Sequence, residues 1–424
     1  MKKQKILVLG GYGGNNVGDD AQLAGSLEFL SQNFPAYTVV TLTPDMKQTY
    51  LRHATEAVGF ASRNALFDFD VKPEIYVRWW KPEHKKWLLT RYKFIVDNVR
   101  KYCSGGGHKL SKRQVDFCEN IKTASLIYYV GGGYLMGPTA SRLWDAALVA
   151  EIAQIYETPI VFSGHNIGIW ENPENQEFGK KLFGKSRLIT TRDRVFSKKE
   201  LESIGICGDH IYATCDDALF LKTNKSKDKV DKVLDSLGLR NDDFIAFSFH
   251  DLNVATEIFE VIKKYETKNI LIIPTCPPDV KVQESFISQI KGEERVKRVD
   301  KLLTFSETKE IFSRSLYCIS TRHHPLIFTL SASKPCISIN TTEYFSKKNY
   351  GALNLCNIDN FNIDFDKENI VATQEAIKEG ILKINRDYDL YRKLISESFY
   401  RINAARDRFK EDISAILNSS AAYL

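Results

Sequence analysis

Arg322, His323 and His324 are consecutive residues whose side chains are well suited to chemistry. A guanidinium group binds a carboxylate or a phosphate through paired N–H groups, and an imidazole exchanges protons near neutral pH. These three side chains therefore predict a site that binds a small anion and transfers a proton. The alternative is a histidine that caps a helix weakly and an arginine that pairs with a surface carboxylate.

The elements expected around these residues place them at a helix N-terminus. The apolar run Tyr317 to Ser320 is typical of a strand, and Leu326 to Ala332 is expected to be helical, with Pro325 at the first helical position. A second strand is expected at Cys336 to Asn340. Because a helix N-terminus carries partial positive charge, cations ahead of it are favourable only if an anion lies between them and the helix.

A glycine-rich loop near the start of the chain also lies between an expected strand and the N-terminus of a helix. The strand Lys5 to Gly10 runs into the sequence GGYGGNNVGDD, and a helix follows. Asn16 stands where a dinucleotide fingerprint needs its third glycine, which disfavours NAD binding. Asp19 and Asp20 open the helix, where they either stabilise its N-terminus or act as a base or a ligand for a hydroxyl group.

Further polar loops follow expected strands in both halves of the chain. In the first half these loops carry glycine, histidine, arginine or aspartate, at Gly131-Gly132-Gly133, Gly164-His165-Asn166-Ile167-Gly168, Arg192-Asp193 and Asp216-Asp217. In the second half His250 follows the strand Phe244 to Phe249. Ligands of open α/β sheets gather at the carboxyl ends of strands, so these loops are expected to lie near one another.

The order of strands and helices predicts two α/β domains and a closing helical segment. Residues 1–222 form the first expected domain, and the lysine-rich stretch 222–232 leads into the second domain, 223–361. From about Asn362 to residue 424 the chain is charged and is expected to be helical, without new strands, and to pack back across both domains.

Composition excludes several classes of protein. The 424 residues carry a net charge of +6, a mild excess that suits an acidic small substrate and is too small to indicate a nucleic-acid-binding protein. The eight cysteines occur singly, which disfavours zinc sites and redox pairs and is typical of reduced thiols in the cytoplasm. The apolar run at the N-terminus is too short for a signal peptide, and no run is long enough to span a bilayer. Asp-x-Asp occurs at 68–70 and at 364–366 in unrelated contexts, so no metal site is predicted.

Residues 78–113 form a basic segment with an aromatic start, Trp79, Trp80 and Trp87. Apolar residues recur there at helical spacing, which predicts an amphipathic helix packed on the core with a solvated basic face. The alternative is a surface that contacts anionic lipid or a lipid-linked phosphate, so that the protein associates with a membrane.

The ordered set of loops resembles the polysaccharide pyruvyl transferase family. The pattern G-x-x-N-x-G-D matches Gly13, Asn16, Gly18 and Asp19. The later motifs match the glycine run 131–133, the turn 164–168, the Arg192-Asp193 pair, and Arg322-x-His324 followed by an apolar helix. The resemblance runs to about residue 350. His165-Asn166 replaces the usual Gln-Gly of the family, and the segment 78–113 has no counterpart in the resemblance.

This resemblance implies two Rossmann-like domains facing across a cleft, as in GT-B enzymes. The implied activity transfers the pyruvyl group of phosphoenolpyruvate onto two hydroxyls of one sugar in a cell-surface polysaccharide or its precursor, with release of phosphate. Phosphoenolpyruvate is the donor substrate, a sugar or lipid-linked glycan is the acceptor, and no cofactor or metal is expected. Rival functions are a glycosyltransferase that uses a nucleotide sugar and a non-catalytic carbohydrate-binding protein on the same fold.

Roles for individual residues follow from the motifs and from the chemistry. His324 is the first candidate for the acid that protonates the donor, His165 is the second, and Asp19 and Asp20 are candidate bases. Arg322, Arg192 and His323 are expected to bind the donor. His323 could also exchange roles with His324. Contacts to the acceptor or within the loops are expected from Gly13, Asn16, Gly18, Asp20, Gly132, Gly133, Asn166 and His250.

Overall fold

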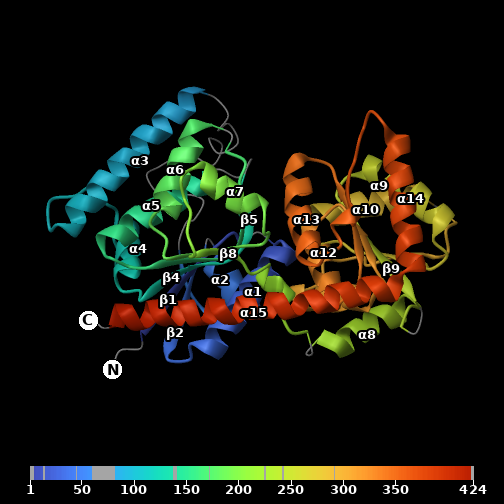
Figure 1. Cartoon of the computed structure of the whole chain (residues 1–424). Helices are drawn as coiled ribbons and strands as arrows, with labels where there is room; N and C mark the ends of the chain where they lie inside the picture. Colours follow the sequence, from blue (N-terminus) through green and yellow to red (C-terminus); the bar gives the residue numbers. More distant parts are fainter. Residues whose placement is uncertain are drawn as a thin grey trace.

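Two parallel β-sheets, each covered by helices, form the body of the protein (Figure 1). The structure is a computed structural model that describes residues 4–12, 15–43, 45–59, 82–136, 141–170, 172–223, 226–240, 243–290 and 292–421. Gly13, Trp79, Trp80 and the Asp68-x-Asp70 pair lie outside these residues, as do the side chains of 82–88.

The first sheet has the order β3-β2-β1-β4-β6-β7-β8, and β5 pairs with β6 outside this path. Its strands are β1 (Gln4–Leu9), β2 (Tyr37–Thr43), β3 (Glu56–Gly59), β4 (Leu126–Tyr129), β5 (Gly132–Met136), β6 (Ile160–Gly168), β7 (Leu188–Thr191) and β8 (Ile211–Ala213). The helices of this part are α1 (Val17–Asn33), α2 (Met46–His53), α3 (Pro82–Cys103), α4 (Lys112–Lys122), α5 (Ser141–Ile155), α6 (Pro173–Phe183), α7 (Phe196–Ser203) and the short 3-10 helix η3 (Asp217–Leu219).

The second sheet has the order β11-β10-β9-β12-β13-β14. Its strands are β9 (Phe244–Ser248), β10 (Asn269–Ile272), β11 (Val296–Arg298), β12 (Cys318–Ser320), β13 (Cys336–Asn340) and β14 (Asn362–Asp364). The helices that follow in this part are α8 (Lys227–Ser236), α9 (Leu252–Tyr265), α10 (Pro277–Gln289), α11 (Phe305–Arg314), α12 (His323–Leu330), α13 (Glu343–Leu355), α14 (Ile370–Arg386) and α15 (Tyr388–Ala421).

Both sheets are doubly wound and Rossmann-like, which confirms the expected fold class. Each sheet reverses its strand order once, between β1 and β4 in the first and between β9 and β12 in the second. Strands such as β4 and β9 are buried along their whole length, because helices cover both faces of a parallel sheet. Ligands of such sheets bind where the strand order reverses, so a ligand site is expected next to the loops after β1 and β12.

The closing helix α15 runs along both sheets (Figure 1). Ile395 and Ile402 belong to the hydrophobic core around the second sheet, whereas Phe409, Ile413 and Leu417 pack with residues of the first sheet. The expected closing helical segment is therefore present and joins the two halves. The domain boundaries at residues 222 and 361 stay predictions.

Several local expectations are wrong. The segment 164–168 is the end of β6 rather than a turn, although Gly164 and Gly168 have positive φ angles of 55° and 123°. The strand β14 lies within the tail that was expected to be helical throughout, because it pairs in parallel with β13. The side chain of Asn340, at the end of β13, adds hydrogen bonds to it. The helix α8 lies in the stretch expected to be a linker.

The helix after Arg322 begins two residues earlier than expected, at His323. Arg322 is its N-cap, with extended backbone angles, and Pro325 is the third helical residue. A proline is tolerated there because the first four N–H groups of a helix have no intrahelical acceptor. Both histidines are thus fixed by helical geometry rather than by a loop.

Candidate functional site

A cavity of about 270 Å³ lies between the two halves of the protein. The first half contributes Gly11, Asn16, Asp19, Gly133 and Tyr134 to its lining. The second half contributes the loop after β10, the start of α12 and the start of α13, through Thr275, Cys276, Arg322, His323, His324, Tyr344, Phe345 and Lys348. The lining therefore comes from carboxyl-end loops of both sheets, as expected for a site between two Rossmann-like units.

The N-terminus of α1 closes one side of the cavity. The Asn16 side chain caps this helix by accepting a hydrogen bond from the backbone N–H of Gly18 at 2.9 Å. The backbone N–H of Val17 donates to the carbonyl of Thr275 at 3.0 Å, which joins the two halves directly. A side chain at position 18 would overlap the ring of His324, so the close approach of α1 to α12 requires glycine there.

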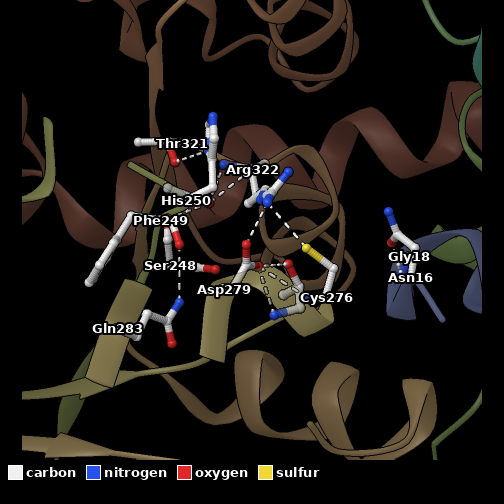
Figure 2. Close-up of polar contacts among 12 residues, drawn as sticks. Asn16, Gly18, Ser248, Phe249, His250, Cys276, Asp279, Gln283, Thr321 and Arg322 are labelled. Carbon is white, nitrogen blue, oxygen red and sulfur yellow. Dashed lines mark hydrogen bonds and ion pairs between the residues drawn. The ribbon is translucent and has the colours of Figure 1, made fainter. Parts of the chain in front are cut away.

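Arg322 is held at the second-half side of the cavity. Its Nη2 atom forms an ion pair with Asp279 and lies 3.1 Å from the sulfur of Cys276 (Figure 2). Its Nε atom is buried and has no hydrogen-bond partner among the described residues. The side chain is 23% exposed, so part of the guanidinium remains available to a ligand in the cavity.

Beneath the cavity, both histidines face one buried carboxylate, that of Asp216. The Nε2 atoms of His323 and His324 lie 3.6 Å and 3.8 Å from its Oδ2 atom. The same oxygen lies 3.3 Å from Nη1 of Arg192 and accepts a hydrogen bond from Gln22 at 2.9 Å. Asp216 therefore links the two imidazoles to the guanidinium of Arg192.

The charges in this cluster determine which groups are ionised. Burial opposes ionisation of Asp216, but Arg192 and the two histidines hold its pKa below the usual range. Burial and the charge of Lys348 lower the pKa of His323 to about 4. Burial also lowers the pKa of His324 well below its ordinary value, although the Asp216 carboxylate acts in the opposite direction. At neutral pH both imidazoles are thus neutral and Asp216 beneath them is ionised.

The tautomer of His323 follows from its neighbours. Its Nδ1 atom lies 2.8 Å from Oδ1 of Asn349, whose amide nitrogen donates to Ser338 and Asn340. Nδ1 must therefore carry the proton that is donated to Asn349, and Nε2 is left without one in the neutral ring. A proton taken up by His323 would enter at Nε2, next to Asp216.

The first turns of α13 provide the remaining wall of the cavity. Tyr344 and Lys348 are four residues apart and share one face of this helix. The hydroxyl of Tyr344 donates to the carbonyl of Gly133 on β5 at 3.3 Å, a second contact between the two halves. Phe345 packs against His250, with ring centroids 5.4 Å apart.

The structure brings six of the predicted site residues together around the cavity. They are Asn16, Asp19, Gly133, Arg322, His323 and His324. Asp19 is the carboxylate among these lining residues, which fits the candidate role of base but does not test it. Gly13 lies outside the described residues.

Arg192 does not lie where a donor-binding residue would. It is 1% exposed, and its Nε atom donates to the carbonyl of Gly164 at 2.9 Å while Nη1 pairs with Asp216. The end of β6 covers this side chain, so Arg192 does not line the cavity, and its contact with a donor stays a prediction. Arg192 instead fixes the charge of Asp216 beneath the histidines.

His165, Asn166 and Asp20 are also absent from the cavity wall. His165 is fully buried on β6, and Tyr134 stands between it and the cavity, with the hydroxyl 2.9 Å from Nε2. Asn166 is buried beside Arg192 at 3.5 Å. Asp20 forms an ion pair with Arg52. His165 and Asn166 do not line the site because β6 is buried on both faces, and Asp20 points from α1 in another direction than Asp19.

The other predicted contacts lie next to the cavity. Gly18 packs under His324, and Gly132 packs against Tyr134. The Nδ1 atom of His250 lies 2.8 Å from the hydroxyl of Thr321, and burial and the nearby charge of Arg322 lower the pKa of His250 to about 4. His250 therefore supports Arg322 and Phe345 and does not itself line the cavity.

Asp216, Lys348 and Tyr344 were missed as site residues. Asp216 follows an expected strand, so its position at a carboxyl edge was a usable signal. Lys348 and Tyr344 could have been found from their helical spacing after the strand Cys336–Asn340. Their convergence with α12 depends on tertiary structure, which the spacing alone does not give.

The described part of the chain contains neither a cluster of metal ligands nor a membrane-spanning helix. There, no group of three or more His, Cys, Asp or Glu side chains is placed to hold a metal ion. None of the helices in that part is both long and apolar enough to cross a membrane.

Comparisons with known proteins identify a family and a fold. The family model of polysaccharide pyruvyl transferase matches residues 16–343. No curated protein matches the chain. Among solved structures, UDP-GlcNAc 2-epimerase from Neisseria meningitidis, bound to UDP-GlcNAc, is similar with a TM-score of 0.62 and 15% identity, covering 97% of this chain and 100% of that one. A glycosyltransferase from Rickettsia africae has a TM-score of 0.55 and 12% identity, covering 100% and 98%. At these identities the likeness concerns the fold, which is of the GT-B type.

Proposed function

Because the chain belongs to the polysaccharide pyruvyl transferase family, we propose that it forms a pyruvyl ketal on a sugar, with phosphoenolpyruvate as the donor. The observation that carries the proposal is the cavity between the two halves. Arg322, Lys348 and two histidines surround it from one half, and Asp19 faces them from the other. A small, multiply anionic donor suits this arrangement, and a sugar hydroxyl can approach from the side of Asp19.

The first step adds one sugar hydroxyl across the enol double bond. His324, once protonated, gives its proton to the methylene carbon, and the sugar oxygen forms a bond to C2. Asp19 takes the proton of that hydroxyl. In the second step the bond from C2 to the phosphate oxygen breaks and phosphate leaves with the electron pair. The second hydroxyl then bonds to C2 and gives its proton to the departing phosphate. Because both hydroxyls belong to one sugar, the second step is intramolecular and favoured.

The acid must first acquire its proton. In the empty site burial keeps the pKa of His324 well below its ordinary value, so the ring is neutral at pH 7. A bound phosphate and carboxylate would favour the charged imidazole and raise this pKa. Donor binding at neutral pH is therefore expected to take up a proton from solution.

The direct test measures phosphate released from phosphoenolpyruvate in the presence of a panel of glycosides. Wild-type protein is expected to release phosphate with at least one glycoside, and His324→Gln to lower turnover by about 100-fold or more. Proton uptake on donor binding, measured by titration calorimetry in buffers of different ionisation enthalpy, should be lost in the same variant. Normal turnover by His324→Gln would contradict the assignment of the acid.

The rival glycosyltransferase function predicts binding of a different donor. It requires a pocket for a nucleotide base and ribose, and its donor would be a nucleotide sugar. Titration with UDP and with phosphoenolpyruvate separates the two: binding of UDP alone would favour the glycosyltransferase and overturn the ketal transferase. A protein that binds a glycan and neither donor would be the non-catalytic carbohydrate-binding alternative.

For the acceptor we propose a lipid-linked glycan, with α3 facing the membrane surface. Lys93, Arg100 and Lys101 lie on the exposed face of this helix, while Ile95 and Val99 pack into the core. A basic exposed face attracts anionic lipid. The double variant Lys93→Glu/Lys101→Glu is expected to co-sediment less with anionic vesicles. Lys229→Glu/Lys393→Glu, with the same change of charge on α8 and α15, is the control, and equal losses in both would contradict the proposal.

A further inference from the structure

Lys348 is a buried cation in the cavity wall. The residue is 8% exposed, and no carboxylate of the described residues lies within ion-pair distance of its ammonium group. The adjacent Lys347 is different, because it pairs with Glu343 and packs over the ring of Phe196. A charge buried without a counterion is costly, so an uncompensated ammonium group in a cavity indicates a site for an anion.

Two neighbours define the position of the ammonium group, Tyr344 and Gly133. It lies over the ring of Tyr344, with 5.5 Å to the centroid, and a Cβ added to Gly133 would stand 3.3 Å from it. Its charge also helps to lower the pKa of both His323 and His324. Lys348 lines the same cavity as His323 and His324, so one small ligand there can contact all three.

Arg322 and Lys348 suit different anionic groups of such a ligand. The guanidinium of Arg322 is already paired with Asp279, so its charge is partly compensated, and its planar shape suits a carboxylate. The ammonium group of Lys348 is uncompensated by the described residues and can donate up to three hydrogen bonds, which suits the more highly charged phosphate.

We propose that Lys348 binds the phosphate of the donor and neutralises it as it leaves. This inference rests on the proposed function. When the bond between C2 and the phosphate oxygen breaks, the electron pair stays on that oxygen, and the ammonium group stabilises the added charge. Arg322 holds the carboxylate, which remains on the product, so the two cations act on different parts of the reaction.

The test compares Lys348→Met with Lys347→Met as the matched control. Inorganic phosphate is expected to bind Lys348→Met about 10- to 100-fold more weakly, because one charge-assisted contact is lost, while pyruvate binds as to the wild type. Arg322→Met is expected to show the reverse pattern. Lys347→Met should bind both probes normally.

Folding of the variant is checked by its melting temperature. In buffer without phosphate Lys348→Met should melt no lower than the wild type, because the uncompensated charge has been removed, and added phosphate should no longer raise its melting temperature. Unchanged phosphate affinity, or equal loss of phosphate and pyruvate, would overturn the assignment. If the wild type binds phosphate through Lys348 but releases none from phosphoenolpyruvate, the anion site stands and the proposed transferase function fails.

Discussion

At the scale of residues, the cluster below the cavity controls where protons can reside. His323 and His324 both direct Nε2 at the same oxygen of Asp216, and Arg192 keeps that carboxylate ionised. Both Nε2 atoms are buried without a hydrogen-bond partner among the described residues. The empty site is therefore prepared to accept a proton when an anion enters, which is the change the proposed reaction needs.

The lowered pKa of His323 predicts a pH-dependent stability. An unfolded histidine titrates near 6.5, whereas the folded pKa is about 4, so between these values the unfolded chain binds more protons. The stability from this residue is fully present above about pH 6.5 and is lost as the pH falls toward about 4. At about pH 5 the loss from His323 should be about 2 kcal/mol, measured from urea unfolding of the ligand-free protein.

The control for this prediction is His323→Asn, which can still donate to Asn349 but does not titrate. Its loss of stability between about pH 7 and pH 5 should be smaller than that of the wild type by about 2 kcal/mol. Identical pH profiles for the two proteins would show that His323 titrates normally in the folded state.

At the scale of elements, the N-terminus of α1 serves both halves. Val17 and Ala21 pack into the core of the second sheet, whereas Leu23 and Leu30 pack with the first. Its first turn carries Asp19 to the cavity and places Gly18 against His324. The position of the candidate base relative to the candidate acid therefore depends on this one helix.

Gly18→Ala should disturb that relation although alanine favours helices. The added methyl group overlaps the His324 ring, and overpacking of this kind costs about 1–3 kcal/mol. We expect a lower midpoint of thermal unfolding and a loss of turnover of about tenfold or more, since the acid is displaced. Ser31→Ala, at an exposed position of the same helix, should leave both measurements unchanged. Full activity in Gly18→Ala would show that α1 and α12 can separate without loss of function.

The order of most strands and helices could be predicted from the sequence. The end of β6 and the strand β14 could not. Apolar runs bounded by glycine and polar residues mark strands such as β4 and β13, and the restart of the pattern at Phe244 marks the second sheet. The end of β6 was misjudged because Gly164 and Gly168 are also typical of turns. The polar strand β14 was missed because it lacks an apolar run, and its parallel pairing with β13 is a tertiary contact that local patterns do not contain.

The site could be predicted only where the motif itself faces the cavity. Arg322 and His324 come just after an expected strand, so their position at the carboxyl end of that strand could be predicted from the sequence. Arg192 occupies an equivalent position, yet it is buried because Gly164 and Asp216 bind its guanidinium from two other strand ends. Which side of a loop faces a ligand is decided by such tertiary contacts, and local sequence patterns do not contain them.

At the scale of the whole molecule, α15 ties both sheets to the floor of the site. Arg406 forms an ion pair with the buried Asp217 at 2.6 Å and lies over the rings of Phe29 and Phe220. Asp217 also accepts hydrogen bonds from Ser26 and Ser163. Because Asp217 follows Asp216 directly, the last helix supports the residue that faces both histidines.

Arg406→Met should therefore be strongly destabilising. The methionine keeps apolar packing but leaves a buried carboxylate unpaired, which costs about 3–5 kcal/mol. Arg408→Met is the matched control, since Arg408 is 51% exposed and pairs loosely with Asp412, so its loss should cost less than about 1 kcal/mol. Urea unfolding of the two variants checks the difference. Similar stabilities would contradict the prediction and show that the ion pair between Arg406 and Asp217 contributes little to stability.

The hydrogen bond between the N–H of Val17 and the carbonyl of Thr275 is made entirely by main-chain atoms. Replacement of either side chain leaves the N–H donor and the carbonyl acceptor in place, provided that neither residue becomes proline and the backbone conformation is unchanged. Side chains in the cavity wall can therefore be replaced, and the ligand that they bind changed, while this backbone contact between the two halves stays the same. The side chains that bind a ligand and the backbone hydrogen bond that joins the two halves are therefore separate features of the same interface.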